Sequence, residues 1–185
     1  MERPNVPSWS AEEGTPAAAI CDAREVANFF LDYAKARGIV LTQIPLQKIL
    51  YFAHAWFLVR RGRPLIDEEF EAWEYGPVVR SIHEQFRRFG DQPIVAKATR
   101  LNFVNGKYEE VPHRFDGEVA GALEKVFDFY SRYEAFALVE MTHEPNGPWD
   151  QVYRSGTQSA RVGMQIPNGL IGQHFAQFYK DRLFN

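Results

Sequence analysis

Residues 46–61 constrain the fold of this chain more than any other stretch. Apolar side chains recur there at helical spacing and wrap well over half of the helix circumference. They are Leu46, Ile49, Leu50, Ala53, Trp56, Phe57 and Val59. Gly62 ends this helix, and Pro64 prevents its resumption. Because a helix that is apolar on most sides is stable only when other elements surround it, the sequence predicts a central helix inside a mainly α-helical domain.

Further helices are expected around the central one. Asp22, with Glu25 three residues later, predicts a capping box at a helix start, and Gly38 is a natural stop. Gly76-Pro77 predicts a turn that opens another helix, with the proline at or near its first position. That helix is expected to end at Gly90. Start and stop signals of the same kind predict helices at residues 117–133, 135–142, 149–153 and 168–183.

Two segments have the pattern of β-structure. Residues 68–75 alternate loosely between apolar and acidic side chains, which predicts a short strand. Leu101–Val104 and Lys107–Val111 flank Asn105-Gly106, a dipeptide that favours a two-residue type I′ turn. Because an isolated hairpin is marginally stable, this one must lean on the helices or pair with residues 70–75. The expected fold is a single compact helical domain with a small antiparallel β element near residues 101–111.

The length of the chain fits this single domain. With 185 residues and 45% apolar side chains, the chain can bury a sizeable core. We find no boundary that divides residues 20–185. Residues 1–19 are rich in Pro, Ser, Glu and Ala and predict a tail. Trp9 within that tail favours packing against the domain or against a partner.

Charge and cysteine content narrow the function classes. The formal net charge of -3 disfavours a non-specific nucleic-acid binder, which is usually basic. The single cysteine, Cys21, excludes a disulfide framework and a Cys-based zinc site within one chain. No apolar run approaches the ~18 residues of a membrane span, and residues 1–20 lack the pattern of a secretory signal. We therefore expect a cytoplasmic protein that does not enter a membrane.

No catalytic or metal-binding set is assembled in the sequence. Glu140-x-x-His143 has the spacing of a di-iron ligand pair, but such a site needs a second pair. His83-Glu84 is explained by a solvated helix face, and Cys21 has no identifiable partner histidine. Signature motifs for nucleophiles, phosphates and dinucleotides are absent. We expect no enzymatic activity, no cofactor and no metal.

Nucleic-acid binding is the weaker alternative. Basic side chains gather at residues 60–63 and at Arg80, Arg87 and Arg88, and they would form a stripe if they met in space. They are better explained as charges that complement the negative C-terminal ends of their helices. The helix pair at 117–133 and 135–142 lacks the Arg, Asn and Gln side chains of a reading helix. A DNA-binding autorepressor is kept as an alternative that predicts salt-dependent binding to its own promoter.

Several ordered blocks of this sequence resemble one protein family. They are Leu46-Gln-Lys-Ile-Leu-Tyr-Phe-Ala-His-Ala-Trp56, Gly62-Arg-Pro-Leu65, Phe70-Glu-Ala-Trp-Glu-Tyr-Gly-Pro-Val-Val79 and Leu138-Val-Glu-Met-Thr-His-Glu144 followed by Pro148-Trp149. This pattern is similar to the Panacea domain of SocA-like and GepA-like, phage-associated antitoxin proteins. The resemblance runs from about Val26 to Phe178. Asn146-Gly147 loosens the last block, and residues 91–112 carry no family signature.

The resemblance implies an antitoxin. Panacea domains accompany unrelated toxins and neutralise them, largely by direct protein contact, so the expected partner is a cognate protein toxin. Some relatives resemble proteolytic adaptors that hand the toxin to an AAA+ protease of the ClpXP type, and this is a second alternative. The resemblance implies no enzymatic activity. Whether the chain forms a homo-oligomer stays open.

Candidate toxin contacts come from two sets of residues. Most apolar motif residues, such as Leu46 and Trp56, are expected in the core, with Trp149 as a buried plug. The polar or amphipathic motif residues Gln47, Lys48, Glu74, Tyr75, Arg80 and Glu84 are candidates for toxin contact and equally for internal hydrogen bonding. A family that serves many toxins is expected to vary its binding surface. The hairpin region 91–112 therefore adds Phe103 and Tyr108, and the tail adds Trp9.

Overall fold

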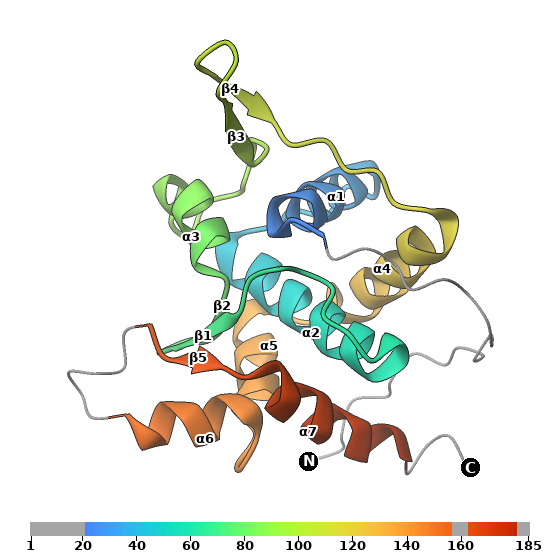
Figure 1. Cartoon of the computed structure of the whole chain (residues 1–185), viewed down its shortest axis with the longest axis vertical. Coiled ribbons are helices and arrows are strands. Elements are labelled where there is room, and N and C mark those ends of the chain that lie inside the picture. The colour runs from blue at the N-terminus through green and yellow to red at the C-terminus, as the bar shows by residue number, and fades with distance from the viewer. Residues whose placement is uncertain (1–20, 157–162, 181–185) are drawn as a thin grey trace.

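A computed structural model describes residues 21–156 and 163–180 (Figure 1). The helices in these ranges are α1 (Ala23–Ala36), α2 (Gln43–Arg61), α3 (Arg80–Phe86), a short 3-10 turn (Arg87–Phe89), α4 (Gly117–Tyr130), α5 (Ala135–Thr142), α6 (Pro148–Ser155) and α7 (Asn168–Lys180). The strands are β1 (Phe70–Trp73), β2 (Gly76–Val78), β3 (Thr99–Asn102), β4 (Lys107–Glu110) and β5 (Gln165–Ile166). The predicted mainly α class with a minor β component is confirmed. The predicted tail 1–19, including Trp9, lies outside the described residues.

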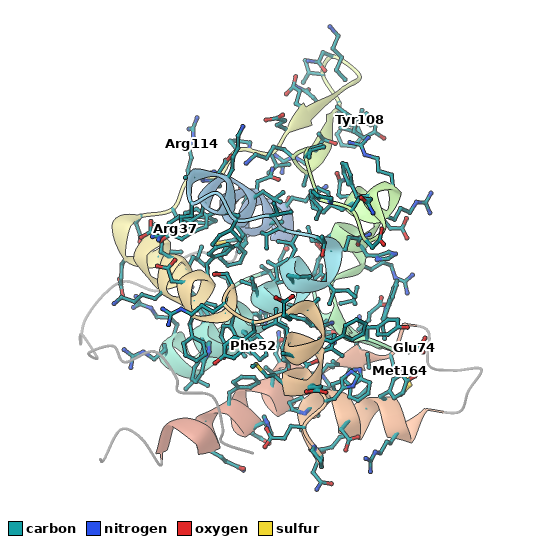
Figure 2. All side chains as sticks on the ribbon, turned by 180° about the vertical axis from the view of Figure 1, so that it is seen from behind. Arg37, Phe52, Glu74, Tyr108, Arg114 and Met164 are labelled. Atoms are coloured by element: carbon teal, nitrogen blue, oxygen red, sulfur yellow. The ribbon has the colours of Figure 1, made fainter. Side chains whose placement is uncertain are left out.

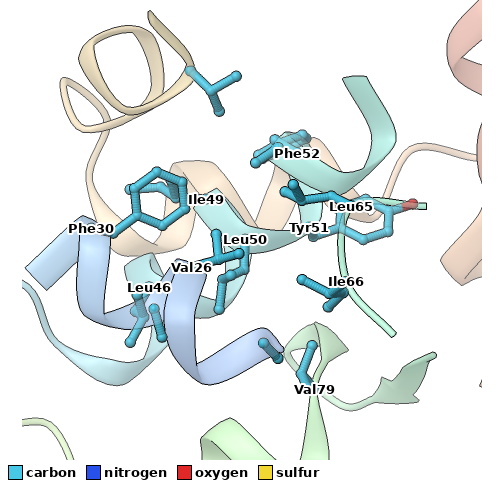
Figure 3. Close-up of a cluster of buried hydrophobic side chains, with 14 of the residues drawn as sticks. Val26, Phe30, Leu46, Ile49, Leu50, Tyr51, Phe52, Leu65, Ile66 and Val79 are labelled. Atoms are coloured by element: carbon cyan, nitrogen blue, oxygen red, sulfur yellow. The ribbon is translucent and has the colours of Figure 1, made fainter. Parts of the chain in front are cut away.

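Helix α2 occupies the centre of the molecule, as its apolar pattern predicts. Every residue from Leu46 to Phe57 is buried, and α1, α4, α5 and α7 pack around the helix (Figures 1 and 3). The helix begins at Gln43, three residues before the predicted start. Pro45 is tolerated there because the first turn needs no backbone N–H. Gly62 ends the helix at a φ of 66°, where its N–H donates to the Leu58 carbonyl oxygen.

Aromatic rings fill much of the space around α2. The ring of Phe52 stacks on that of Tyr130 of α4, with centroids 4.0 Å apart. Trp56 donates from Nε1 to the hydroxyl of Tyr130 at 3.1 Å and meets Phe175 of α7 edge-on. A stacked pair of rings therefore joins α2 to α4, and an edge-to-face pair joins it to α7.

Helix α1 begins where the sequence predicts, but its cap differs in detail. The Asp22 carboxylate accepts from the backbone N–H of Arg24 at 2.9 Å and from the Arg24 guanidinium. The predicted capping box with Glu25 is wrong, because the N–H of Glu25 donates to the carbonyl oxygen of Asp22 instead. The Asp22 carboxylate caps the N–H of Arg24, one residue before the N–H of a capping box, because it also binds the charged side chain of Arg24.

A small sheet lies beside α2, with the strand order β2–β1–β5. Trp73 pairs with Gly76, so Glu74 and Tyr75 form the turn between β1 and β2. The prediction that Gly76-Pro77 opens a helix is wrong: both residues belong to β2, and α3 begins only at Arg80. Pairing with β1 keeps this segment extended, which local turn signals do not reveal.

The second sheet is an isolated hairpin of β3 and β4, which we call the arm (Thr99–Glu110). It projects from the helical body (Figure 1), and it does not pair with residues 70–75. The sequence left open whether the hairpin leans on the helices or pairs with residues 70–75, and the structure shows that it contacts the helices. The predicted two-residue turn is also wrong, because Asn102 pairs with Lys107 and the loop has the four residues 103–106. Gly106 alone in this loop has a positive φ, whereas a type I′ turn needs two such residues.

Candidate functional site

The arm is fixed to the helical body by a buried carboxamide. Asn28 of α1 is fully buried, and its Nδ2 donates to the carbonyl oxygens of Ala98 and Val111 at 2.9 and 2.8 Å. Its Oδ1 accepts from the N–H of Ala98 at 2.7 Å. The side chain therefore lies between the two chain segments that enter and leave the arm. Because unpaired buried backbone groups are costly, these bonds hold the base of the arm in one position.

Two further side chains secure the same base. Gln85 of α3 bonds both backbone groups of Thr99, donating to the carbonyl oxygen at 3.1 Å and accepting from the N–H at 3.0 Å. Lys97 donates to the carbonyl oxygen of Asn28 and forms an ion pair with Asp32. Neither Asn28 nor Gln85 is predicted from the sequence. At helical spacing Asn28 falls beside Arg24 and Asp32, on the polar side of the helix, so the sequence pattern gives no signal that its side chain is buried.

The outer part of the arm exposes large apolar side chains. Phe103 and Val104 in the loop are 89% and 97% exposed, and Tyr108 on β4 is 71% exposed. Tyr108 lies opposite Leu101 of β3 and is labelled at the edge of the molecule in Figure 2. Phe103 and Tyr108 are two of the predicted contact residues, and Val104 was missed although it adjoins Phe103. We call Phe103, Val104 and Tyr108 the arm surface.

A second exposed group surrounds the turn between β1 and β2. Glu74 and Tyr75 are exposed, and Arg80 makes a two-pronged ion pair with Glu71 at 2.7 and 2.8 Å. Trp73 Nε1 donates to the same carboxylate at 2.8 Å. Glu84 on α3 pairs with Arg87 at 3.1 Å. We call Glu74, Tyr75, Arg80 and Glu84 the turn surface. Figure 1 shows α3, which carries Arg80 and Glu84, between the turn of β1 and β2 and the arm.

Gln47 and Lys48, the other two predicted contact residues, lie in the interior. Of the two roles expected for them, the structure shows internal hydrogen bonding. The Gln47 carboxamide bonds the N–H and the carbonyl oxygen of Val79 at 2.9 and 3.1 Å. Lys48 Nζ donates to the carbonyl oxygen of Pro77 at 2.9 Å, and burial lowers the pKa of this amine to about 7. Lys48 therefore positions β2, and Gln47 positions the residue that follows it.

The last of the recognised sequence blocks, which contains His143 and Trp149, contacts the end of β1. His143 stacks on Trp149 with ring centroids 3.6 Å apart, and Trp149 Nε1 donates to the carbonyl oxygen of Trp73 at 2.8 Å. Trp149 is the buried plug that the sequence predicts. His143 Nε2 is buried without a partner in the described structure, and burial and the nearby charge of Lys48 lower the pKa of this imidazole. The recognisable sequence blocks therefore build the scaffold beneath the turn surface.

The groups considered for catalysis do not converge. Burial, with nearby carboxylates, raises the pKa of the Cys21 thiol to about 11, so the reactive thiolate is disfavoured. His83 packs against the ring of Trp73, and His143 against Trp149. In residues 21–156 and 163–180, no group of three His, Cys, Asp or Glu side chains could hold a metal ion. No helix in the same ranges is both long and apolar enough to cross a bilayer.

Three arginines of the predicted basic clusters are paired with carboxylates. Arg61 forms an ion pair with Glu118, Arg80 with Glu71, and Arg87 with Glu84. A surface that binds the phosphate backbone needs basic groups that are free to release counterions. Arg61, Arg80 and Arg87 are therefore not free to neutralise phosphates.

Comparison with known proteins points to one family. Residues 46–150 match the family described as "Antitoxin SocA-like, Panacea domain". The protein named Antitoxin SocA from Caulobacter vibrioides (strain NA1000 / CB15N) is 36% identical over 154 residues, which cover 83% of this chain and 82% of that relative. No solved structure matches the chain.

Proposed function

This chain belongs to the SocA-like antitoxin family with a Panacea domain, and on that premise we propose that it neutralises a cognate protein toxin by binding it directly. The arm surface is the observation that carries the proposal. Nearly complete exposure of adjacent large apolar side chains is typical of surfaces that bind another protein. The arm meets this description at Phe103 and Val104, and Tyr108 adds a side chain of the kind enriched at interface hot spots.

The firm base of the arm supports the same proposal. A flexible loop loses conformational entropy when it binds, which weakens the complex. The bonds of Asn28 and Gln85 to Ala98, Val111 and Thr99 order the base of the arm before any partner arrives. The turn surface extends the proposed contact area to Tyr75 and Arg80. Neither Gln47 nor Lys48 is included, because both are buried.

The test compares two double variants with matched chemistry. Phe103→Ser with Val104→Ser removes the apolar part of the arm loop. Val40→Ser with Phe136→Ser removes similar side chains that are 67% and 68% exposed elsewhere. The probe is the product of the adjacent gene, provided that it arrests growth when expressed alone. We expect the arm variant to lose at least tenfold in affinity and to fail to rescue growth, while the control behaves as the wild type. Equal affinity of the two variants would exclude the arm surface.

The fate of the toxin separates direct neutralisation from delivery to a protease. Direct binding predicts that the amount of toxin stays constant in rescued cells. An adaptor predicts that the toxin disappears only when both this protein and the protease are present. The observation that favours an adaptor is the turn surface, which would stay available if the toxin occupied the arm alone. Immunoblots of the toxin in cells with and without the protease distinguish the two.

A further inference from the structure

The backbone groups of the arm reveal which of its edges is open. Thr99 lies opposite Glu110, and Gln85 engages both the N–H and the carbonyl oxygen of Thr99. These groups therefore point away from β4. Facing residues in an antiparallel pair both direct their backbone groups either inward or outward, so those of Glu110 also point away from the partner strand.

The neighbouring pairs agree with this assignment. The N–H of Val111 donates to the carbonyl oxygen of Ala98 at 3.0 Å, so the next pair along the arm is of the inward, hydrogen-bonded type. Because the two types alternate, the pair of Leu101 and Tyr108 is again of the outward type. Tyr108 and Glu110 thus direct two N–H donors and two carbonyl acceptors away from β3, along the outer edge of β4.

The two edges of the arm differ in accessibility. Gln85 of α3 covers the β3 edge at Thr99. All four residues of β4 are exposed, and no residue within 21–156 or 163–180 bonds the outward groups of Tyr108 or Glu110. An uncovered edge with unpaired donors and acceptors is a template for strand addition.

We propose that an extended segment of the toxin adds to the arm as a third strand along β4. This inference rests on the proposed function and names how the toxin is held. Tyr108 and Glu110 share one face of the strand, because side chains alternate between faces. The incoming segment would therefore carry an apolar side chain beside Tyr108 and a basic one beside Glu110, two residues apart.

The charges on the arm favour this occupant. Glu110 is exposed and has no ion-pair partner in the described part of the chain. Glu109, on the opposite face, accepts from the side-chain amides of Asn102 and Asn105 at 3.0 and 2.8 Å and lies across from Arg100. The negative charge of Glu110, on the same face as Tyr108, is thus left for a partner to compensate.

A second copy of this chain fits the edge less well. In one antiparallel register, the outward backbone groups of both Tyr108 and Glu110 pair between the two copies. This register places Tyr108 of one copy opposite Glu110 of the other. The same register places Glu109 directly opposite Glu109 of the second copy. Like charges that face each other across a strand pair are destabilising. Pairing of two copies is therefore disfavoured, although it is one outcome that the experiment must detect.

Two substitutions of Glu110 distinguish the contribution of its backbone N–H to toxin binding from that of its carboxylate. Glu110→Pro removes the outward N–H, which the arm itself does not use, and proline is tolerated at an edge strand. Glu110→Ala removes the carboxylate and keeps the N–H. Titration calorimetry with the purified toxin should show Glu110→Pro binding at least tenfold more weakly than Glu110→Ala. Equal affinities of the two variants would overturn strand addition.

Amide exchange in the wild-type protein tests strand addition without a substitution, so its result does not depend on whether Glu110→Pro disturbs the arm. On toxin binding, the amides of Tyr108 and Glu110 should become protected, while that of Glu109, which already belongs to the ladder, changes little. Unchanged exchange at Tyr108 and Glu110 would contradict the proposal. Protection before toxin is added, together with a dimeric mass in light scattering, would assign the edge to a second copy and overturn it as well. Absence of any binding by the wild type would instead contradict the proposed function.

Discussion

Lys48 shows what a single buried amine does to stability. Its pKa is lowered by burial from 10.5 to about 7. Between these values the unfolded chain holds the proton and the folded chain does not, so the free energy of unfolding rises with pH. We predict that, relative to Lys48→Met, the wild type gains up to ~1.4 kcal/mol of stability per pH unit from pH 7 to pH 9. Urea unfolding of both proteins at pH 7, 8 and 9 measures this difference.

An exposed lysine provides the control for that measurement. Lys35 lies exposed on α1, and Lys35→Met, measured at the same three pH values, shows what the replacement of a surface lysine by methionine contributes. A difference between the wild type and Lys48→Met that stays constant from pH 7 to pH 9 would show that the Lys48 amine stays charged in the folded protein.

A glycine is required at position 76, both for its backbone conformation and because the neighbouring side chains leave no room for a Cβ. Its φ is 93°, and an added Cβ would overlap Thr142 Oγ1 and lie 3.0 Å from Lys48 Nζ. We predict that Gly76→Ala lowers the free energy of unfolding by at least ~2 kcal/mol, because backbone strain and overpacking add. Gly121→Ala within α4, where a Cβ meets nothing, should instead raise it by ~0.5–1 kcal/mol. Thermal unfolding that ranks the two variants in the opposite order would contradict this account.

At the level of elements, the position of the arm depends on one side chain of α1. Asn28→Leu keeps a similar volume but leaves the N–H of Ala98 and the carbonyl oxygen of Val111 without their polar partner. The buried backbone groups then favour opening of the arm by ~2–4 kcal/mol, estimated from the usual cost of unmade hydrogen bonds. We predict faster amide exchange across residues 98–111 and weaker toxin binding.

The matched control for this prediction lies in the outer part of the arm. Asn102 bonds only the side chain of Glu109 and the N–H of Val104, both exposed. Asn102→Ala should leave exchange at Ala98 and Val111 unchanged. If the two variants accelerate exchange at Val111 equally, the arm is not held by Asn28.

Elements with a strong local signal could be predicted from the sequence, and those fixed by distant partners could not. The apolar wrap of α2 and the glycine after it predict a central helix that ends at residue 61. The hairpin was also predicted, but its four-residue loop was not, because Asn105-Gly106 suits more than one turn. The prediction that Gly76-Pro77 opens a helix is wrong for a different reason, because only pairing with β1 makes this segment a strand.

For the molecule as a whole, recognition of the family and location of the binding surface are separate problems. The ordered blocks identify the family because they build a scaffold in which Lys48, Gly76 and Trp149 constrain one another. The arm lies outside those blocks and owes its position to Asn28 and Gln85, contacts between residues far apart in the chain. Sequence patterns could nominate Phe103 and Tyr108, but they could not show that the outer edge of β4 is open.

The buried titratable groups also act together on the stability of the whole molecule. His54 is fully buried, accepts from the N–H of Ile66 at Nδ1 and is 2.8 Å from Asn168 Oδ1 at Nε2. Burial lowers its pKa to about 4, so stability is lost as the pH falls from 6.5 towards 4, where the unfolded chain alone binds the proton. Burial raises the pKa values of the Tyr51 and Tyr130 phenols, so above pH 10 the unfolded chain alone releases their protons.

These groups together predict a stability maximum at mildly alkaline pH. His54 opposes unfolding fully only above pH 6.5, Lys48 adds stability from pH 7 upward, and the two phenols remove it above pH 10. We therefore expect the free energy of unfolding to peak between about pH 9 and pH 10, well above the isoelectric point of 6.0. Urea unfolding from pH 5 to pH 11 measures the curve, and Lys48→Met should move its maximum towards pH 7. A maximum near pH 6 in the wild type would mean that surface charge, and not these buried groups, governs the stability of this protein.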